Sequence, residues 1–255
     1  MAPILEARDL SKNFGGIAAL RSVSFDAETG LITAIIGPNG AGKTTLFNLI
    51  AGVYPPTTGT VLLRGQSLNG LRAHQRVPLG LARTFQAAFL FSNMTVIENV
   101  MTGRHTRSGY GWLDAAFRTP RARQEEDDIL LEATRYLNLV GLGARAEESA
   151  ASLPFGEQRL LAIARALATE PSVLLLDEPG AGLNALEKSE LADLLRRLRE
   201  MGITVLLVEH DMDLVMRTAD WVVVLDFGEK IAEGTAAVVQ KDPKVIAAYL
   251  GEDLS

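Results

Sequence analysis

One short segment of the chain combines flexible glycines with a lysine and two hydroxyl residues, a combination suited to holding phosphate groups. Residues 37–45 read Gly-Pro-Asn-Gly-Ala-Gly-Lys-Thr-Thr and fit the pattern G-x-x-x-x-G-K-[ST] at every fixed position. Glycines let main-chain N–H groups approach phosphate oxygens, and a helix that begins at the lysine adds its positive N-terminal dipole. The predicted nucleotide-phosphate site consists of Gly37, Pro38, Asn39, Gly40, Ala41, Gly42, Lys43, Thr44 and Thr45.

Three side chains of this segment have distinct expected roles. Lys43 supplies a point charge to the β- and γ-phosphates, the Thr44 hydroxyl can ligate Mg²⁺, and Thr45 can contact the phosphates nearby. The alternative is a glycine-rich turn that only leads into a helix, and the full match directly after an apolar run favours the phosphate site. A dinucleotide site is disfavoured because G-x-G-x-x-G is absent here.

An acidic pair follows a second apolar run. Residues 173–176, Val-Leu-Leu-Leu, lead directly into Asp177 and Glu178. Ligands of an open α/β sheet bind at the carboxyl ends of its strands. We therefore expect Asp177 to hold Mg²⁺, often through water, and Glu178 to polarise an attacking water as general base. The alternative is an exposed loop with two acids, which the phosphate segment makes less favoured.

The elements that position these residues follow from the hydrophobic pattern. Compact apolar runs, which suit parallel strands buried on both faces, occur at residues 31–36, 173–176, 204–208 and 222–225. Helical spacing lies between them at Leu191, Leu194, Leu195 and Leu198 and, less regularly, at Leu130, Ala133, Thr134 and Leu137. Strands alternating with helices predict an α/β fold with a mainly parallel sheet. Residues 1–30 and 58–70 instead read as short strands with glycine-rich turns.

Composition narrows the class of protein. The chain has 255 residues, 47% of them hydrophobic, which is enough for a substantial core in one domain or two joined lobes. A net charge of −6 argues against a binder of duplex nucleic acid. There is no cysteine, hence no disulfide framework. No signal peptide is evident, and no apolar run approaches the ~20 residues of a membrane helix, so we expect a soluble chain.

Further segments occur in a fixed order around these motifs. Residues 153–167 read Leu-Pro-Phe-Gly-Glu-Gln-Arg-Leu-Leu-Ala-Ile-Ala-Arg-Ala-Leu, His210 follows the run 204–208, and Gln86 ends Arg-Thr-Phe-Gln. Each is unremarkable alone, but their joint order and spacing resemble the ATPases of ABC transporters. In that resemblance Phe14 stacks on adenine, Gln86 contributes to catalysis and to Mg²⁺, and His210 is the switch histidine. The signature that contacts a partner's ATP is then Leu153, Pro154, Phe155, Gly156 and Glu157.

The resemblance covers nearly the whole chain and implies a fold. That fold is an α/β P-loop NTPase of the RecA-like kind, with a parallel-sheet core, an antiparallel β subdomain and an inserted helical subdomain. Residues 1–255 would form one ABC ATPase domain. Its ATP-binding core would be residues 1–86 and 159–255, and its helical subdomain, with the signature, about 87–158. The catalytic residues implied are Lys43, Gln86, Glu178 and His210, with Thr44, Gln86 and Asp177 at the metal.

The signature departs from the usual L-S-G-G-Q. Pro154 and Phe155 replace serine and the first glycine, Glu157 replaces glutamine, and Asn184 ends an interface loop where aspartate is usual. One explanation of these departures is an impaired ATPase. Because the expected catalytic residues are intact, we favour the other explanation, that the departures are characteristic of a subfamily. An aromatic before the signature glycine, the Ala-Gly-Leu-Asn loop and the sequence after Lys43 resemble one ATPase of the bacterial importers of branched-chain amino acids.

This subfamily implies partners and a location. They are a second ABC ATPase, identical or different, two transmembrane permease subunits and a periplasmic or extracellular substrate-binding protein that acts through the permease, with no nucleic acid. The chain would lie peripherally at the cytoplasmic face of the bacterial inner membrane. Residues 85–99 and the basic stretch 104–123 are candidates for the permease-facing surface, although a solvated loop is an equal explanation for the second.

Three alternatives compete with this interpretation. A lipid or lipopolysaccharide exporter ATPase would share the fold and chemistry. A soluble ABC ATPase acting on DNA or ribosomes is disfavoured because the chain has no room for a long coiled coil and only one ATPase copy. A P-loop GTPase or small-molecule kinase is the third, and the base-reading N-K-x-D motif of a GTPase is absent.

Overall fold

The chain forms two compact units. The structure is a computed structural model that describes residues 2–84, 89–104 and 120–250. Unit 1 contains Met1–Arg76 and Ser172–Ser255, and unit 2 contains Val77–Pro171. The boundaries expected from the sequence, 86/87 and 158/159, both fall inside unit 2. The second of them cuts a continuous helix, α6 (Phe155–Leu167).

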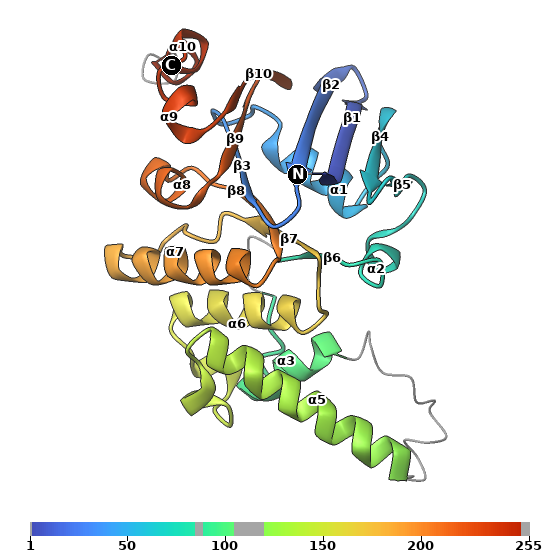
Figure 1. Ribbon diagram of the computed structural model, residues 1–255, viewed down its shortest axis with the longest axis vertical. Helices are drawn as coiled ribbons and strands as arrows, with labels where there is room; N and C mark the ends of the chain where they lie inside the picture. The colour runs from blue at the N-terminus through green and yellow to red at the C-terminus, as the bar shows by residue number, and fades with distance from the viewer. Residues whose placement is uncertain (1, 85–88, 105–119, 251–255) are drawn as a thin grey trace. The chain divides into compact units, whose positions relative to one another are not determined.

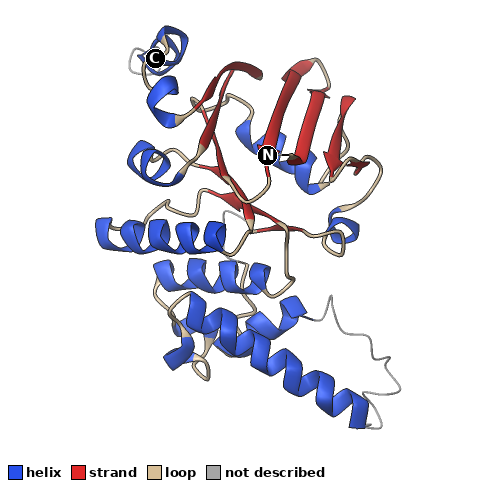
Figure 2. Ribbon diagram, viewed as in Figure 1, coloured by secondary structure: helices blue, strands red, loops and turns tan. Residues whose placement is uncertain are grey.

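A parallel sheet forms the centre of unit 1 (Figures 1 and 2). Its strands are β3 (Ile32–Ile36), β7 (Val173–Asp177), β8 (Thr204–Val208), β9 (Trp221–Asp226) and β10 (Glu229–Gly234), arranged in the order β10-β9-β3-β8-β7. β3 pairs in parallel with β8 and β9, β7 pairs in parallel with β8, and β10 is antiparallel to β9. Every residue of β3, β7 and β8 is buried. The four apolar runs are therefore buried strands of this sheet, as the sequence predicts.

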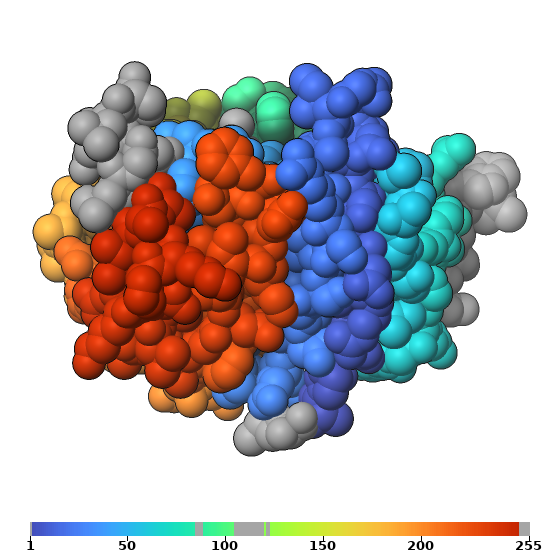
Figure 3. All heavy atoms as spheres, turned by 90° about the horizontal axis from the view of Figure 1, so that it is seen from above, coloured from blue at the N-terminus to red at the C-terminus, as the bar shows by residue number. Residues whose placement is uncertain are grey.

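An antiparallel sheet lies beside this core. Its order is β2-β1-β4-β5, with bounds Ile17–Glu28, Pro3–Phe14, Thr58–Leu63 and Gln66–Ser67. Figure 3 shows the C-terminal elements of unit 1, in red, against the blue surface of the first two strands. This sheet corresponds to the short strands expected in residues 1–30 and 58–70.

The helices of unit 1 differ in how they begin, and two of them start at residues whose side chains cap the helix. Their bounds are α1 (Lys43–Ala51), α2 (Ala73–Arg76), α7 (Ala185–Glu200), α8 (Met212–Thr218), α9 (Ala236–Val239) and α10 (Pro243–Leu250). Asn184 caps α7 and forms a reciprocal capping box with Glu187. The Asp211 carboxylate caps α8 by accepting from the Leu214 N–H at 3.0 Å. Both caps fix helices that start close to the predicted catalytic residues.

Unit 2 is mainly helical. It contains the short strand β6 (Leu81–Arg83), α3 (Val96–Arg104), α5 (Pro120–Leu139), the single turns Gly143–Arg145 and Ala150–Ser152, and α6. α3 packs against α5 and α6. A Cβ atom at Gly103 of α3 would lie 2.2 Å from the Arg165 carbonyl oxygen of α6, so glycine permits the close approach of these helices.

The predicted apolar face of α5 is wrong at one position. Ala133 and Leu137 are buried as expected, but Leu130 is 45% exposed and Ile129 is buried in its place. The buried stripe thus runs through Ile129, Ala133, Tyr136, Leu137 and Val140. Leu130 lies at the edge of this stripe, since one residue along a helix is a rotation of about 100°. No helix among residues 2–84, 89–104 and 120–250 is long and apolar enough to span a membrane.

Candidate functional site

The phosphate loop is the turn between β3 and α1. Its glycines have positive φ angles: 149° at Gly37, 78° at Gly40 and 99° at Gly42. A Cβ atom at Gly37 would lie 2.0 Å from the Leu225 carbonyl oxygen, and one at Gly42 would lie 2.8 Å from that of Ala19. Gly37 and Gly42 are therefore required both by backbone conformation and by neighbouring main chain. The loop therefore lies between the end of β9 and the start of β2.

Lys43 is buried and its ammonium group reaches back over the loop. Its Nζ donates to the carbonyl oxygens of Gly37 at 2.6 Å and of Pro38 at 2.8 Å. These bonds hold the ammonium group at the phosphate loop. The arrangement places the Lys43 ammonium group and the positive N-terminal end of α1 at the same loop, which suits a polyphosphate.

Glu178 and His210 meet at the ends of two neighbouring parallel strands. Asp177, the buried last residue of β7, is paired in register with Val208 of β8. The Glu178 N–H then donates to the Val208 carbonyl at 2.9 Å, and Glu178 has a φ of 48°. Its Oε1 lies 2.8 Å from His210 Nε2. The side chain of one predicted catalytic residue is thus hydrogen-bonded to the other.

One cavity of about 510 Å³ joins these parts. Its lining residues are Ile17, Ala18, Ala19, Arg21, Asn39, Gly40, Ala41, Gly42, Lys43, Thr44, Thr45, Glu178, His210 and Phe227. The phosphate loop and the Glu178–His210 pair therefore open into one space. This is the arrangement needed to bring a terminal phosphate to a carboxylate base.

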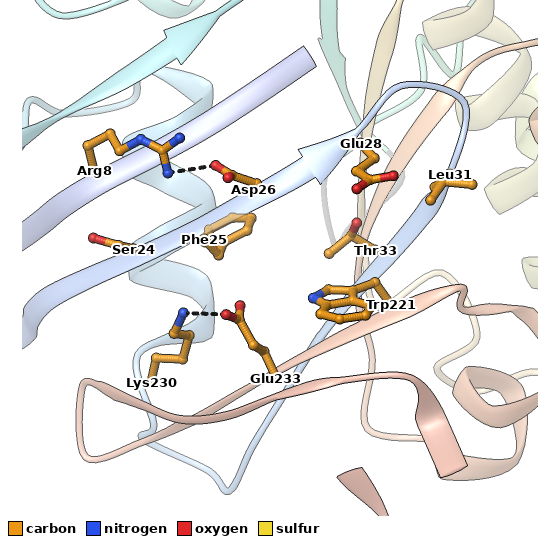
Figure 4. A pocket seen from close by; sticks show the side chains of 10 residues that line it. All are labelled: Arg8, Ser24, Phe25, Asp26, Glu28, Leu31, Thr33, Trp221, Lys230 and Glu233. Carbon is orange, nitrogen blue, oxygen red and sulfur yellow. Dashed lines mark ion pairs between the residues drawn. The ribbon is translucent and has the colours of Figure 1, made fainter. Parts of the chain in front are cut away.

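Two other cavities of unit 1 do not combine these features. One, of about 1010 Å³, lies between Pro38–Ala41 of the phosphate loop and α10. The other, of about 580 Å³, lies between β2 and the β9–β10 pair (Figure 4). Four of its charged side chains form two ion pairs, Arg8 with Asp26 at 2.6 Å and Lys230 with Glu233 at 3.0 Å. Neither of these two cavities is lined by Glu178 or His210, so the cavity of about 510 Å³ is the candidate site.

Phe227 is a site residue that the sequence motifs do not include. It stands in the β9–β10 turn, is 79% exposed and lines the candidate cavity. The next residue, Gly228, donates its N–H to the Ala41 carbonyl at 3.1 Å, and its own carbonyl accepts from the Arg21 N–H at 2.8 Å. The turn therefore braces the phosphate loop against β2. A Phe-Gly pair between two strand patterns is the signal that could have indicated it.

Glu209 is a second residue that the motifs miss. It stands between β8 and His210, and it is only 2% exposed. Its carboxylate accepts from the main-chain N–H groups of Gly180 at 2.6 Å and His210 at 3.1 Å. Burial raises the pKa of Glu209, and the N–H groups that it accepts from oppose that rise. An acidic residue directly after an apolar strand is the signal available in the sequence.

Phe14 lies at the end of β1 and is 46% exposed. Its ring meets the edge of Tyr54, with 5.3 Å between the ring centroids, and Lys12 Nζ is 5.2 Å from its centroid. Phe14 is not among the residues that line the candidate cavity. Its adenine-stacking role stays a prediction. Gln86 lies outside the described residues, as does most of the basic stretch 104–123.

The signature segment lies in unit 2, at the start of α6. Pro154 precedes the helix in an extended conformation, and Gly156 is buried in the first turn. Phe155 is exposed, with the Arg159 guanidinium 4.8 Å from its ring centroid. Glu157 forms an ion pair with Arg145. The exposed Phe155 and the paired Glu157 give this segment a surface unlike that of the usual serine, glycine and glutamine.

A family model described as ABC transporter matches residues 20–181, which include the phosphate loop, the signature and the acidic pair. This chain belongs to the ABC transporter ATP-binding family. A second family model, described as branched-chain amino acid ATP-binding cassette transporter, matches residues 229–254 of this ABC family member. The resemblance inferred from the motifs is confirmed.

Proteins similar to this chain are named as ATP-binding proteins of branched-chain amino acid transport. The chain is 43% identical over 251 residues to the high-affinity branched-chain amino acid transport ATP-binding proteins BraF of Pseudomonas aeruginosa and LivG of Escherichia coli. Each match covers 98% of this chain and 98% of the relative. Among solved structures, the ADP conformation of MJ1267, an ATP-binding cassette of an ABC transporter, is 32% identical. Its TM-score is 0.86, with 98% of this chain and 100% of that chain covered. The predicted ABC ATPase fold is confirmed.

Proposed function

We propose that this chain binds ATP and hydrolyses it to energise an ABC importer for branched-chain amino acids or related amino acids and amides. The observation that carries the proposal is the cavity that joins the phosphate loop to the Glu178–His210 pair. A phosphate loop alone supports only binding. A carboxylate that opens into the same cavity and is hydrogen-bonded to a histidine supports hydrolysis.

The phosphates of ATP bind first to the loop of residues 37–45. Main-chain N–H groups and the N-terminal dipole of α1 attract the negative charge. Lys43, now held by two carbonyl oxygens of the loop, turns its Nζ to the β- and γ-phosphates. Phe14 stacks on the adenine at the end of β1.

The residues present fit a magnesium ion. Thr44 presents a hydroxyl at the start of α1, and Asp177 a carboxylate at the end of β7. Oxygen ligands of this kind suit Mg²⁺, which keeps several waters and shares the phosphates. Thr44, Asp177 and Gln86 would hold the ion. When bound, it neutralises charge on the phosphate oxygens.

Hydrolysis requires a water placed in line with the γ-phosphate. The Glu178 carboxylate orients this water and accepts its proton as the new P–O bond forms. His210 fixes Glu178 through the 2.8 Å contact and offers its imidazole to the γ-phosphate. The leaving group is ADP, whose charge is balanced by Lys43. Positioning and charge stabilisation, the main sources of catalysis in phosphoryl transfer, thus come from three short segments of unit 1.

A second ATPase subunit completes each site. Two cassettes stack head to tail, so that residues 153–157 of this chain contact the ATP held by the partner. The solved dimer of MJ0796, a bacterial ABC transporter cassette, is 26% identical to this chain and has a TM-score of 0.78 over 91% of it, which supports such an assembly. The altered Pro154, Phe155 and Glu157 make the two ATP sites of a mixed dimer inequivalent.

The import role rests on relatives. BraF and LivG are named as transport ATP-binding proteins for branched-chain amino acids, and the match at residues 229–254 bears the same description. The full assembly would add two permease subunits and a substrate-binding protein, with this chain peripheral at the cytoplasmic face of the inner membrane. An exporter of lipid or lipopolysaccharide shares the chemistry but has no such support.

The test is to copurify the full-length chain from its native membrane and identify the proteins that accompany it. The proposal predicts two permease subunits, a second ATPase and ATPase activity that rises when substrate-loaded binding protein is added. Recovery of lipid-export components, chromatin or ribosomes in place of permeases would overturn the import role while leaving the ATPase assignment intact.

A further inference from the structure

Glu209 is a buried carboxylate that lies between the two segments of the hydrolytic site. It follows β8 directly and precedes His210, and its exposed fraction is 2%. Burying a carboxylate is costly unless hydrogen bonds compensate it. Its location and burial call for an explanation, since neither of its oxygens lines the candidate cavity.

The two oxygens of Glu209 contact different loops. Oε1 accepts from the Gly180 N–H at 2.6 Å, two residues after Glu178. Oε2 accepts from the His210 N–H at 3.1 Å and lies 3.5 Å from that of Asp211. One side chain therefore connects the main chain that follows Glu178 to the main chain that carries His210.

Gly180 is shaped for this contact. A Cβ atom there would lie 2.9 Å from Glu209 Oε1 and 2.9 Å from Leu214 Cδ2. A side chain at position 180 would displace the end of the Glu209 or Leu214 side chain and disturb the hydrogen bond to the Gly180 N–H. The 2.6 Å hydrogen bond from the Gly180 N–H therefore fits best with glycine at this position.

We propose that Glu209 is a positioning residue for ATP hydrolysis, which sets the spacing between Glu178 and His210 by tying their loops together. The inference rests on the proposed role of Glu178 as general base. Glu178 has a φ of 48°, an unfavourable conformation for glutamate that its surroundings must maintain. The bonds at Gly180 and His210 anchor the main chain on both sides of the 2.8 Å contact between the catalytic side chains.

The loops also have anchors that do not involve Glu209. The Glu178 N–H donates to the Val208 carbonyl, and Asp211 caps α8 and pairs with Lys188 of α7. Loss of Glu209 should therefore leave the fold intact while the two loops shift by a fraction of an ångström. Misplacement of this size lowers the rate of chemistry more than it lowers the affinity for substrate, because the phosphate loop is untouched.

The test compares E209Q with a matched control, D220N, in the native transporter complex. The glutamine amide keeps one acceptor oxygen and turns an N–H group toward one of the two loops. Asp220 also accepts from a main-chain N–H, that of Ile32 at 2.9 Å, but at the end of β3 opposite the phosphate loop. We expect E209Q to lower kcat for ATP at least tenfold with KM changed less than threefold, and D220N to leave kcat within twofold. A kcat within twofold of wild type for E209Q, or an equal loss for D220N, overturns the inference.

A double-mutant cycle separates positioning from simple destabilisation. G180A should reproduce the selective loss of kcat. The kcat of G180A/E209Q should lie no more than about twofold below that of the slower single variant, because both changes break the same contact. Multiplicative losses contradict the inference. E178Q in the same series keeps the two ideas apart: normal turnover by E178Q refutes the proposed base, whereas an inactive E178Q with a fully active E209Q refutes only the positioning role.

Discussion

Replacing Arg76 should weaken unit 1 at the helix that carries the phosphate loop. The Arg76 guanidinium is 2% exposed and donates to the carbonyl oxygens of Leu49 at 2.9 Å, Ile50 at 2.6 Å, Leu68 at 2.9 Å and Leu71 at 3.1 Å. Leu49 and Ile50 belong to the last turn of α1. A cation at this end interacts favourably with the negative end of the helix dipole. Burial lowers the pKa of Arg76, which shows that its charge is held at a desolvation cost.

The size of the effect follows from these bonds. A buried acceptor left without a donor costs about 1–3 kcal/mol. R76M leaves the Ile50 and Leu71 carbonyls without this donor, whereas those of Leu49 and Leu68 still accept from the N–H groups of Gly52 at 3.2 Å and Leu71 at 3.1 Å. Because R76M also removes a desolvated charge, we take the lower end for two acceptors, about 2 kcal/mol. With a urea m-value of about 3 kcal/mol/M, the midpoint falls by roughly 0.7 M.

Urea denaturation followed by circular dichroism measures this shift. R72M is the matched control, because Arg72 is exposed in the same segment and should change stability by no more than about 0.5 kcal/mol. R76K, which keeps the charge but loses the planar fork, should fall between the two. A loss below about 1 kcal/mol for R76M would refute the reasoning that these four bonds hold the end of α1.

Three further changes test other parts of the structure. G37A should lower ATP affinity at least tenfold in an equilibrium binding assay, because its Cβ would meet the Leu225 carbonyl at 2.0 Å; G16A, with open space around its Cβ, should bind normally, and equal affinities would contradict the account. Lys188 lowers the pKa of Asp211, so its contribution to stability is present above the usual aspartate pKa and is lost as pH falls through the lowered value. K188M should therefore be less stable than wild type near pH 7 and converge with it in acid, whereas parallel curves would exclude this linkage. P154S should change ATPase activity less than threefold if the signature is adapted, and a large gain would show that Pro154 impairs it.

The parts of the site that the sequence predicts are those in which side-chain type and spacing are set by chemistry. Lys43, Glu178 and His210 come together because β3, β7 and β8 are parallel neighbours whose carboxyl ends share one edge. The apolar runs identified those strands, and the motifs at their ends identified the residues. His210 was identified only through the resemblance to ABC ATPases, because a lone histidine after a strand carries no such signal.

Glu209 and Phe227 were not predicted because their roles lie in main-chain contacts. The partner of Glu209 Oε1 is the N–H of Gly180, a group that every residue type except proline carries, and Gly180 is distant in the sequence. Phe227 reaches the cavity because the β9–β10 turn is bonded to Ala41. The misassigned Leu130 has a similar cause, since the spacing of apolar residues allows two overlapping faces and only packing selects one.

The central claim is that Glu178 activates the water that attacks ATP, and E178Q tests it most directly. Hydrolysis and nucleotide affinity are measured on the same preparation of the native complex, with E190Q, at an exposed carboxylate of α7, as control. Loss of a general base typically costs 10²–10⁴-fold in rate. We predict at least a ~100-fold lower kcat for E178Q with ATP affinity within about threefold of wild type, and normal behaviour of E190Q. Turnover by E178Q at the wild-type rate would contradict the account.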